Sequence, residues 1–292
     1  MNSRQDIAVL FLARGIGGGL SAAEDFFATY RAHDSGVPHE LIVLVKGWEG
    51  VEGLDRMRKS AAALGAGFLE LPDDGFDLTA YFRAAMQVGH RYVCLLNTHS
   101  RIRADHWLFK LLNGIRQPGV GAAGATGLWQ SGFSDVVAMP LVRDVPWQWW
   151  LLYPLRVIMN AYRFRTFPNP YLRTNALLLE RERYLQFMRA RGAPTTKMKA
   201  QVLESGRKGL SCFIRESGHD IVVVGADGRV FKIGYWPESG TFFVPGHPNL
   251  LVSDNQTRAF DTSDEVHRQI LAYRAWGQRT PNVRGKASWS GL

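Results

Sequence analysis

The sequence predicts an α/β fold in which a mostly parallel sheet is flanked by helices. Two observations lead to this prediction. Short apolar runs of strand length alternate with longer segments of helical spacing from residue 7 to residue 125, which is the pattern of crossover units in a parallel sheet. The chain also has 292 residues, of which 46% are hydrophobic and 21% charged, enough for one large domain with a sizeable core.

The first third of the chain supplies three of the predicted strands, at residues 7–12, 40–45 and 67–71. A glycine-rich loop follows the first strand, and a helix is expected over residues 21–33, with Ser21 and Glu24 as a capping box. The loop resembles a phosphate-binding turn but lacks the full spacing of one, so a plain strand-to-helix turn remains equally open. A second helix is predicted over residues 50–64.

The segment from residue 73 to residue 125 carries the strand around which the fold is organised. A loop leads into a helix for which Asp77 is a candidate N-cap. The apolar strand 92–96 then stops at the polar tetrad Asn97-Thr98-His99-Ser100, as a buried strand does at a ligand crevice. A helix of apolar spacing follows after Trp107 and breaks at Pro118-Gly119, and residues 120–125 form the next strand.

The second half of the chain is less regular. An insertion at about residues 143–170 contains a Trp-rich, Arg-flanked stretch, which indicates either an interfacial membrane segment or a core helix. Further elements are expected downstream: a proline turn that runs into a strand over 167–179, a helix over 180–191, a helix that starts near Leu203 and ends near Gly218, a strand over 221–224 and a last helix over 263–276. We therefore predict a domain over residues 1–235 and an irregular C-terminal extension, residues 236–292, packed on it.

The charge and the cysteine content limit the classes of function that fit the sequence. A net charge of +9 implies an anionic partner, but no nucleic-acid-binding motif accompanies it. Cys94 and Cys212 have no metal-ligand spacing and are expected to be reduced core residues. The sequence shows neither a secretory signal nor an apolar run long enough to span a bilayer, so we expect a cytoplasmic protein, with peripheral binding to the inner membrane as an option.

Two segments occur in an order that resembles a known protein family. The tetrad continues as ADHWLFKLLNGIRQPGVGAAGATG, and PDDGFDLTAYFRAA precedes it. Over residues 6–225 this order resembles the family-2-like glycosyltransferases of the GT-A fold, as found in bacterial polysaccharide and rhamnan synthesis. The resemblance implies a UDP-, GDP- or dTDP-sugar donor, and a glycan or lipid-linked glycan as acceptor. No nucleic acid partner is expected.

The chain departs from the family pattern at the donor site. The family's Asp-x-Asp carboxylates hold a divalent cation on the donor diphosphate, whereas the matching residues here are Asn97 and His99. Amide and imidazole groups bind Mg²⁺ poorly. Either His99 ligates Mn²⁺, or arginines neutralise the diphosphate without a metal. Lys46 stands where the family often has a nucleobase-binding Asp.

Candidate site residues follow from the strand ends and from the resemblance. Strand ends nominate Ala13, Arg14, Gly15, Lys46 and Asp77 to enclose a nucleotide, together with Asn97 and His99. The resemblance implies Glu204 as the general base of an inverting transfer. It also places Arg173, Asn175 and Arg207 near the diphosphate or the acceptor. Asp254 is the alternative base, with Asn255 beside it in a segment that is either a donor-closing loop or a capped turn.

Two other classes of function remain open from the sequence. The missing Asp-x-Asp carboxylates are compatible with a catalytically inactive GT-A-like subunit that binds or scaffolds a polysaccharide assembly system. The basic composition is compatible with a nucleic-acid-binding protein, for which affinity would fall steeply with salt.

Overall fold

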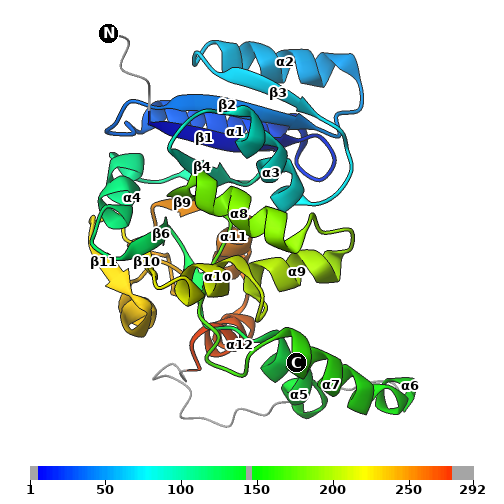
Figure 1. Ribbon diagram of the computed structural model, residues 1–292. Coiled ribbons are helices and arrows are strands. Elements are labelled where there is room, and N and C mark those ends of the chain that lie inside the picture. The colour runs from blue at the N-terminus through cyan, green and yellow to red at the C-terminus, as the bar shows by residue number, and fades with distance from the viewer. Residues whose placement is uncertain (1–5, 143–146, 278–292) are drawn as a thin grey trace.

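An eight-stranded mixed sheet forms the centre of the protein, in the strand order β11-β10-β6-β9-β4-β1-β2-β3 (Figure 1). The structure is a computed structural model and describes residues 6–142 and 147–277. The strands of this sheet are β1 (Ile7–Arg14), β2 (Glu40–Lys46), β3 (Gly67–Leu71), β4 (Tyr92–Leu96), β6 (Val120–Gly124), β9 (Leu177–Glu180), β10 (Asp220–Val224) and β11 (Val230–Lys232). Neighbouring pairs among β1 to β4 are parallel, as are β6 and β10, whereas β9 and β11 run antiparallel to their neighbours. The predicted α/β class with a mostly parallel sheet is confirmed.

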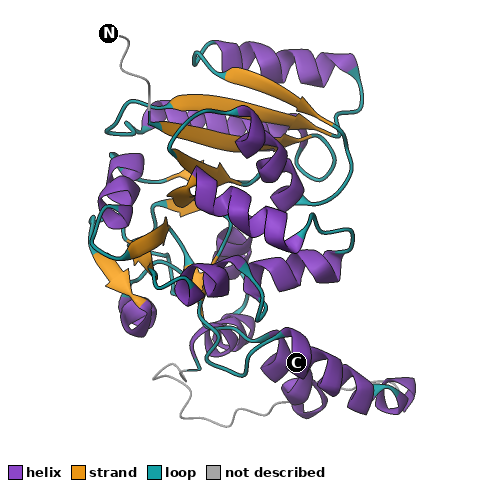
Figure 2. Cartoon of the chain, in the orientation of Figure 1, coloured by secondary structure: helices purple, strands orange, loops and turns teal. Residues whose placement is uncertain are grey.

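Helices cover both faces of the sheet (Figure 2). Alternate residues of β1 face opposite sides, so Val9 and Phe11 pack in one core cluster and Leu10 and Leu12 in the other. The helices are α1 (Gly19–Ala32), α2 (Val51–Ala62), α3 (Asp77–Gln87), α4 (Trp107–Ile115), α5 (Gly132–Val142), α6 (Trp147–Leu151), α7 (Tyr153–Arg163), α8 (Arg181–Arg191), α9 (Lys197–Ser205), α10 (Leu210–Glu216), α11 (Asn255–Thr262) and α12 (Glu265–Trp276). Side chains of α1, α2 and α4 enter the first cluster, and those of α3, α8 and α10 enter the second.

The C-terminal segment is tied to the sheet domain by a short strand pair. Strand β12 (Val252–Ser253) pairs antiparallel with β5 (Arg101–Ile102), the strand directly after the polar tetrad. A second pair joins β7 (Gly127–Leu128) to β8 (Tyr171–Leu172), and a 3₁₀ helix, η1 (Ile233–Glu238), contacts β11. The division at residue 235 stays a prediction. Residues 143–146 of the predicted insertion lie outside the described residues.

Three local predictions were wrong. Helix α1 begins at Gly19 with Gly18 as N-cap, so Ser21 and Glu24 form no capping box. Asp77 is the first residue of α3 and its side chain makes no capping hydrogen bond. Glu204 lies near the end of α9 rather than at a helix start, because Gly206 and Gly209 separate α9 from α10.

Both cysteines are buried and unpaired, as expected of core residues. Over the described part of the chain, no helix combines the length and the apolar character needed to cross a bilayer.

The sheet order places a crevice at the carboxyl ends of the central strands. From β1 the chain runs outward to β2 and β3, then returns to add β4 on the other side of β1. Neighbouring strands whose connections leave in opposite directions leave space between their carboxyl ends, and ligands of open α/β sheets bind there. Arg14, Lys46 and Asn97 all stand at this edge.

Candidate functional site

The loops after β1 and β2 are in direct backbone contact at the carboxyl edge. The Gly15 amide donates to the Lys46 carbonyl at 2.9 Å, and the Ala13 carbonyl accepts from Trp48 Nε1 at 2.8 Å. A Cβ atom on Gly15 would lie 2.4 Å from the Gly47 carbonyl oxygen. Only glycine fits at position 15, because the Gly47 backbone lies too close for a side chain.

Lys46 holds the loop that carries Asp77. Its side chain is buried, and Nζ donates to the carbonyls of Asp74 and Gly75 at 2.8 and 2.9 Å. Burial lowers the pKa of Lys46, and the Arg14 guanidinium adds to this effect. Burial in turn raises the pKa of the Asp77 carboxyl, against the opposing charges of Arg14 and Lys46. Lys46 is therefore committed to loop carbonyls, with Arg14, Asp77, Asp73 and Asp74 as the charged groups around it.

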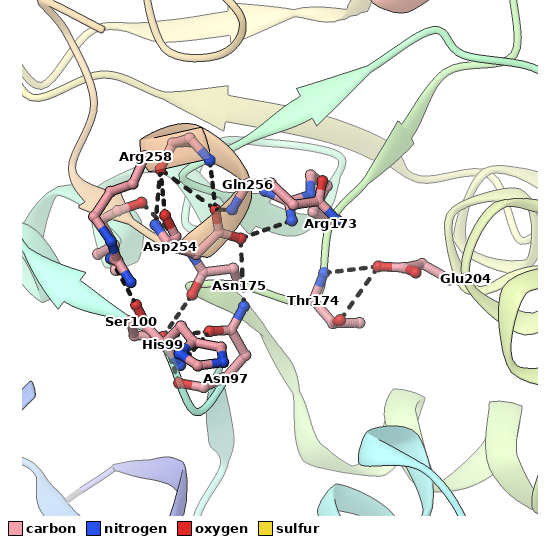
Figure 3. A network of polar contacts seen from close by, with 12 residues as sticks. Asn97, His99, Ser100, Arg173, Thr174, Asn175, Glu204, Asp254, Gln256 and Arg258 are labelled. Carbon is pink, nitrogen blue, oxygen red and sulfur yellow. Dashed lines mark hydrogen bonds and ion pairs between the residues drawn. The ribbon is translucent and has the colours of Figure 1, made fainter. Parts of the chain in front are cut away.

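The polar tetrad is folded back on itself. Asn97 Oδ1 accepts from the His99 amide at 3.0 Å, and Asn97 Nδ2 donates to Asp254 Oδ2 at 3.4 Å. Ser100 Oγ lies 2.7 Å from Asn175 Oδ1, while Asn175 Nδ2 donates to the Val252 carbonyl at 3.4 Å. Both polar atoms of the Asn97 amide are thus engaged within the protein (Figure 3).

Asp254 joins this tetrad to the C-terminal segment. As N-cap of α11 it accepts from the amides of Gln256 and Thr257 through Oδ1, both at 3.0 Å. Its other oxygen, Oδ2, lies 2.6 Å from Arg173 Nη2. Burial alone would raise the pKa of the Asp254 carboxyl, but the Arg173 guanidinium and these hydrogen bonds hold it below its ordinary value. A carboxylate with every acceptor position occupied makes a poor proton acceptor.

Arg173 is the buried cation at the centre of the site. It is 8% exposed, packs 4.8 Å above the Phe242 ring, and pairs with Asp254 through Nη2. Its Nη1 is buried and has no hydrogen-bond partner among the described residues. An unsatisfied buried guanidinium N–H costs free energy, so an anionic ligand that reaches this atom would be stabilised by it.

Glu204 approaches the same region from α9. Its Oε1 accepts from the amide and the hydroxyl of Thr174, each at 3.3 Å. Burial raises the pKa of the Glu204 carboxyl, although Arg173 and the two Thr174 hydrogen bonds act in the opposite direction. Figure 3 shows Glu204 and Asp254 on opposite sides of the 173–175 segment.

A pocket of about 460 Å³ brings these groups together. Its walls include Asp77 at the start of α3, Arg173 and Thr174 before β9, Glu204 on α9 and Gln256 on α11. Gln130 and Asp135 at α5, and Lys197 and Gln201 on α9, add further polar groups to the lining. A second pocket of about 370 Å³ lies at the opposite edge of the sheet, around Asp6 and Glu180. Only the first pocket contains candidate residues from the sequence.

Several candidates lie outside this lining. Asn175 is buried and links the tetrad to β12. Arg207 is exposed, and its Nε donates to the carbonyls of Ala161 and Phe164 at the end of α7, both at 3.0 Å. Asn255 is the exposed first residue of α11. The segment around it is a capped helix start, one of the two forms that the sequence left open.

Thr174 was missed in the sequence, although both of its neighbours were named. In extended chain, successive side chains point to opposite sides. Arg173 and Asn175 therefore face the Asp254 network, and Thr174 faces Glu204. The alternation itself was the signal that could have identified it.

The residues at the strand end do not fit a divalent cation. Within residues 6–142 and 147–277, no three His, Cys, Asp or Glu side chains are grouped so as to hold a metal. The Asn97 carbonyl oxygen already accepts from the His99 amide, and the Asp254 carboxylate is paired with Arg173. A cation placed between them would be repelled by the guanidinium.

Comparison with known proteins gave matches among solved structures. Neither a protein-family model nor a curated protein sequence matches the chain. The chain is similar to a mannosyltransferase from Pyrobaculum calidifontis in complex with GDP-Man and Mn²⁺, at 12% identity and a TM-score of 0.47, over 83% of this chain and 63% of that one. It is also similar to glucosyl-3-phosphoglycerate synthase from Mycobacterium tuberculosis in complex with UDP, at 18% identity and a TM-score of 0.35, over 61% and 58%. For S. aureus TarS in complex with UDP-GlcNAc the values are 13% and 0.33, over 41% and 33%. Each match spans less than two thirds of the other chain.

Proposed function

We propose that the protein is a glycosyltransferase that moves a sugar from a nucleotide-sugar donor to a glycan acceptor with inversion at the anomeric carbon. One observation carries the proposal: a carboxyl with a raised pKa, Glu204, shares a pocket with a buried arginine that has an unsatisfied donor, at the ligand-binding edge of the sheet. A base beside a fixed cation is what transfer to a hydroxyl with an anionic leaving group requires.

Glu204 acts as the general base in this proposal. The acceptor hydroxyl oxygen attacks the anomeric carbon of the donor, and its proton passes to the Glu204 carboxylate. The raised pKa of Glu204 makes its ionised form a stronger proton acceptor than an exposed carboxylate. The Thr174 hydrogen bonds fix Oε1, which leaves Oε2 for the acceptor.

Arg173 stabilises the leaving group. As the bond between the anomeric carbon and the diphosphate oxygen breaks, its electron pair and negative charge move onto the diphosphate. The unpartnered Nη1 donates to that charge, while the ion pair with Asp254 keeps the guanidinium fixed. Arg14 contributes a second positive charge, since its guanidinium acts on the pKa values of both Lys46 and Asp77 in this corner.

The nucleotide lies between the ends of β1 and β3 in this proposal. Ala13, Arg14 and Gly15 form one wall, and Asp77 is held opposite them by the loop that Lys46 anchors. A diphosphate at Arg173 would place the attached nucleoside toward this corner. The donor is thus of the same chemical class as the nucleotide sugars bound in the structures named above.

The acceptor enters from the side of α5 and α9. Gln130, Asp135, Lys197 and Gln201 line that part of the pocket with hydrogen-bonding groups suited to sugar hydroxyls. We propose a lipid-linked or surface polysaccharide glycan as acceptor and the cytoplasmic face of a bacterial inner membrane as the place of reaction.

Two measurements test this function. Thermal-shift titrations with UDP-, GDP- and dTDP-sugars should show stabilisation by one of them, since a ligand that binds only the folded state raises the midpoint. Glu204→Gln should keep this stabilisation and lose about 10²- to 10⁴-fold in donor turnover, the usual contribution of a general base.

Glu52→Gln is the matched control, because Glu52 is exposed on α2, away from the pocket. Its turnover should equal that of the unmodified protein. Absence of stabilisation by any nucleotide, or equal turnover of the two variants, would contradict the proposal. Turnover by neither variant nor the unmodified protein, with nucleotide binding intact, would favour the inactive binding subunit.

A further inference from the structure

Helix α7 carries its apolar side chains on the outside. Leu155, Ile158, Met159 and Tyr162 are spaced as one helical face and are 54%, 66%, 39% and 75% exposed. The opposite side contains Asn160, which is buried. A helix of a water-soluble surface has the reverse arrangement, with apolar residues inward. Some other apolar environment must therefore cover this face when the protein works.

The apolar face continues beyond α7 onto α6. Trp147, Trp150, Leu151 and Leu152 are each more than half exposed. Figure 1 shows α5, α6 and α7 projecting together away from the central sheet, with α6 at the far end. The far end of this projection, α6, therefore carries exposed tryptophan and leucine side chains. We call the exposed apolar residues of α6, α7 and Leu152 between them the outer face.

Positive charge gathers at one end of this face. Arg207 donates to the carbonyls that end α7, and the Arg207 amide donates to the Arg163 carbonyl at 2.8 Å. Lys208 Nζ lies 5.9 Å from the centroid of the exposed Tyr162 ring. No ion pair neutralises Arg163, Arg207 or Lys208 within the described portions of the chain. The basic cluster is therefore free to meet negative charge that lies in the same plane as the apolar face.

We propose that the outer face inserts into the headgroup layer of an anionic lipid bilayer. Tryptophan and tyrosine rings prefer that layer, leucine and isoleucine reach the acyl chains below it, and a flanking basic cluster binds anionic headgroups. The net charge of +9 adds a general attraction to such a surface. A second copy of this chain is the less suitable occupant, because an identical face would offer apolar side chains but no negative charge to the basic cluster.

Helix α5 connects the outer face with the pocket. Helix α5 contacts α7, and Gly132 and Asp135 of α5 line the pocket that contains Glu204. A bilayer under α6 and α7 would hold a lipid-linked acceptor beside the acceptor side of the pocket. This part of the inference rests on the proposed function. Bilayer binding itself does not, since it involves neither donor nor acceptor.

Vesicle flotation tests the proposal. The full chain should float with vesicles of phosphatidylethanolamine and phosphatidylglycerol and bind less to vesicles of phosphatidylcholine alone. Leu155→Ser with Ile158→Ser should weaken binding to the anionic vesicles about tenfold or more, because two apolar side chains no longer enter the bilayer. The control is Val51→Ser with Val266→Ser, two similarly exposed apolar residues on α2 and α12, which should float like the unmodified protein.

Charge is tested by Arg163→Gln with Lys208→Gln, which should reduce binding to anionic vesicles and leave the weaker binding to phosphatidylcholine unchanged. Thermal midpoints of all variants should agree with the unmodified protein, because each altered side chain lies at the surface. No flotation of the full chain, or equal loss in the two serine variants, would overturn the proposal. A dimer in light scattering that only Leu155→Ser with Ile158→Ser dissociates would assign the face to self-association instead.

Discussion

The ion pair between Arg173 and Asp254 offers a sharp test of how the site is held together. Asp254→Asn keeps a capping side chain, because Asn and Asp are equally good N-caps, but it removes the negative charge. If Asn Oδ1 caps the amides of Gln256 and Thr257, its Nδ2 must face Arg173 Nη2, donor against donor. The variant therefore loses either the cap or the partner of Arg173.

The magnitude follows from burial. Arg173 is 8% exposed and Asp254 is 0% exposed. The free-energy cost of breaking a buried ion pair therefore applies, not the smaller cost for a surface pair. Removing one partner of a buried pair costs about 3–5 kcal/mol. The unfolding entropy is about 2.1 cal/mol/K per residue, or about 0.6 kcal/mol/K for 292 residues. The thermal midpoint should therefore fall by about 5–8 °C.

Calorimetry at pH 7 measures this shift, with Asp264→Asn as control. Asp264 caps α12 by accepting from the His267 amide at 2.8 Å but has no cationic partner like Arg173 among the described residues, so its replacement should leave the midpoint unchanged. The pH dependence has a definite sign. The pKa of Asp254 is lowered on folding, so its stabilisation is present above the ordinary Asp pKa and lost as pH falls through the lowered value. Equal midpoints for Asp254→Asn and Asp264→Asn would refute the reasoning.

Two further predictions concern catalysis. Thr174→Val removes one donor to Glu204 Oε1 and should raise the pKa of Glu204 further. The acid limb of the pH profile of kcat/KM should therefore move to higher pH. An unchanged limb would contradict the assignment of Glu204 as base. Because the strand-end residues do not fit a divalent cation, donor turnover should persist in excess EDTA, and loss of turnover that Mn²⁺ restores would contradict the arginine-based neutralisation.

The inner strands of the central sheet, such as β4, were predictable because they are buried on both faces. All five residues of β4 are apolar and buried, and a polar tetrad marks the end of the strand. Such runs stand out in a sequence without knowledge of their neighbours. The start of α1 was not predictable in this way. A Cβ atom on Gly18 would lie 2.3 Å from Thr98 Cγ2, so contact with the tetrad, rather than the local capping pattern at Ser21, helps to fix where the helix begins.

The candidate site was predictable only where it depends on strand ends. Arg14 and Asn97 could be placed at one sheet edge because the carboxyl ends of parallel strands meet there. The role of Asp254 could not be predicted, since it depends on contacts with Asn97, 157 residues away, and with Arg173. The hydrophobic periodicity of one segment gives no information about contacts with segments so far away in the sequence.

Under the proposed function, the same network would take the place of the carboxylate pair that the resemblance implies and this chain lacks. Asp254 comes from the C-terminal segment and fixes Arg173, whose positive charge opposes the rise in the pKa of Glu204. Without the negative charge of Asp254, the Arg173 charge would act on Glu204 with less compensation. Asp254→Asn should therefore lower the pKa of Glu204 and move the acid limb to lower pH, opposite to Thr174→Val. If both variants move the limb in the same direction, Arg173 does not couple the two carboxylates, and the diphosphate must be neutralised elsewhere.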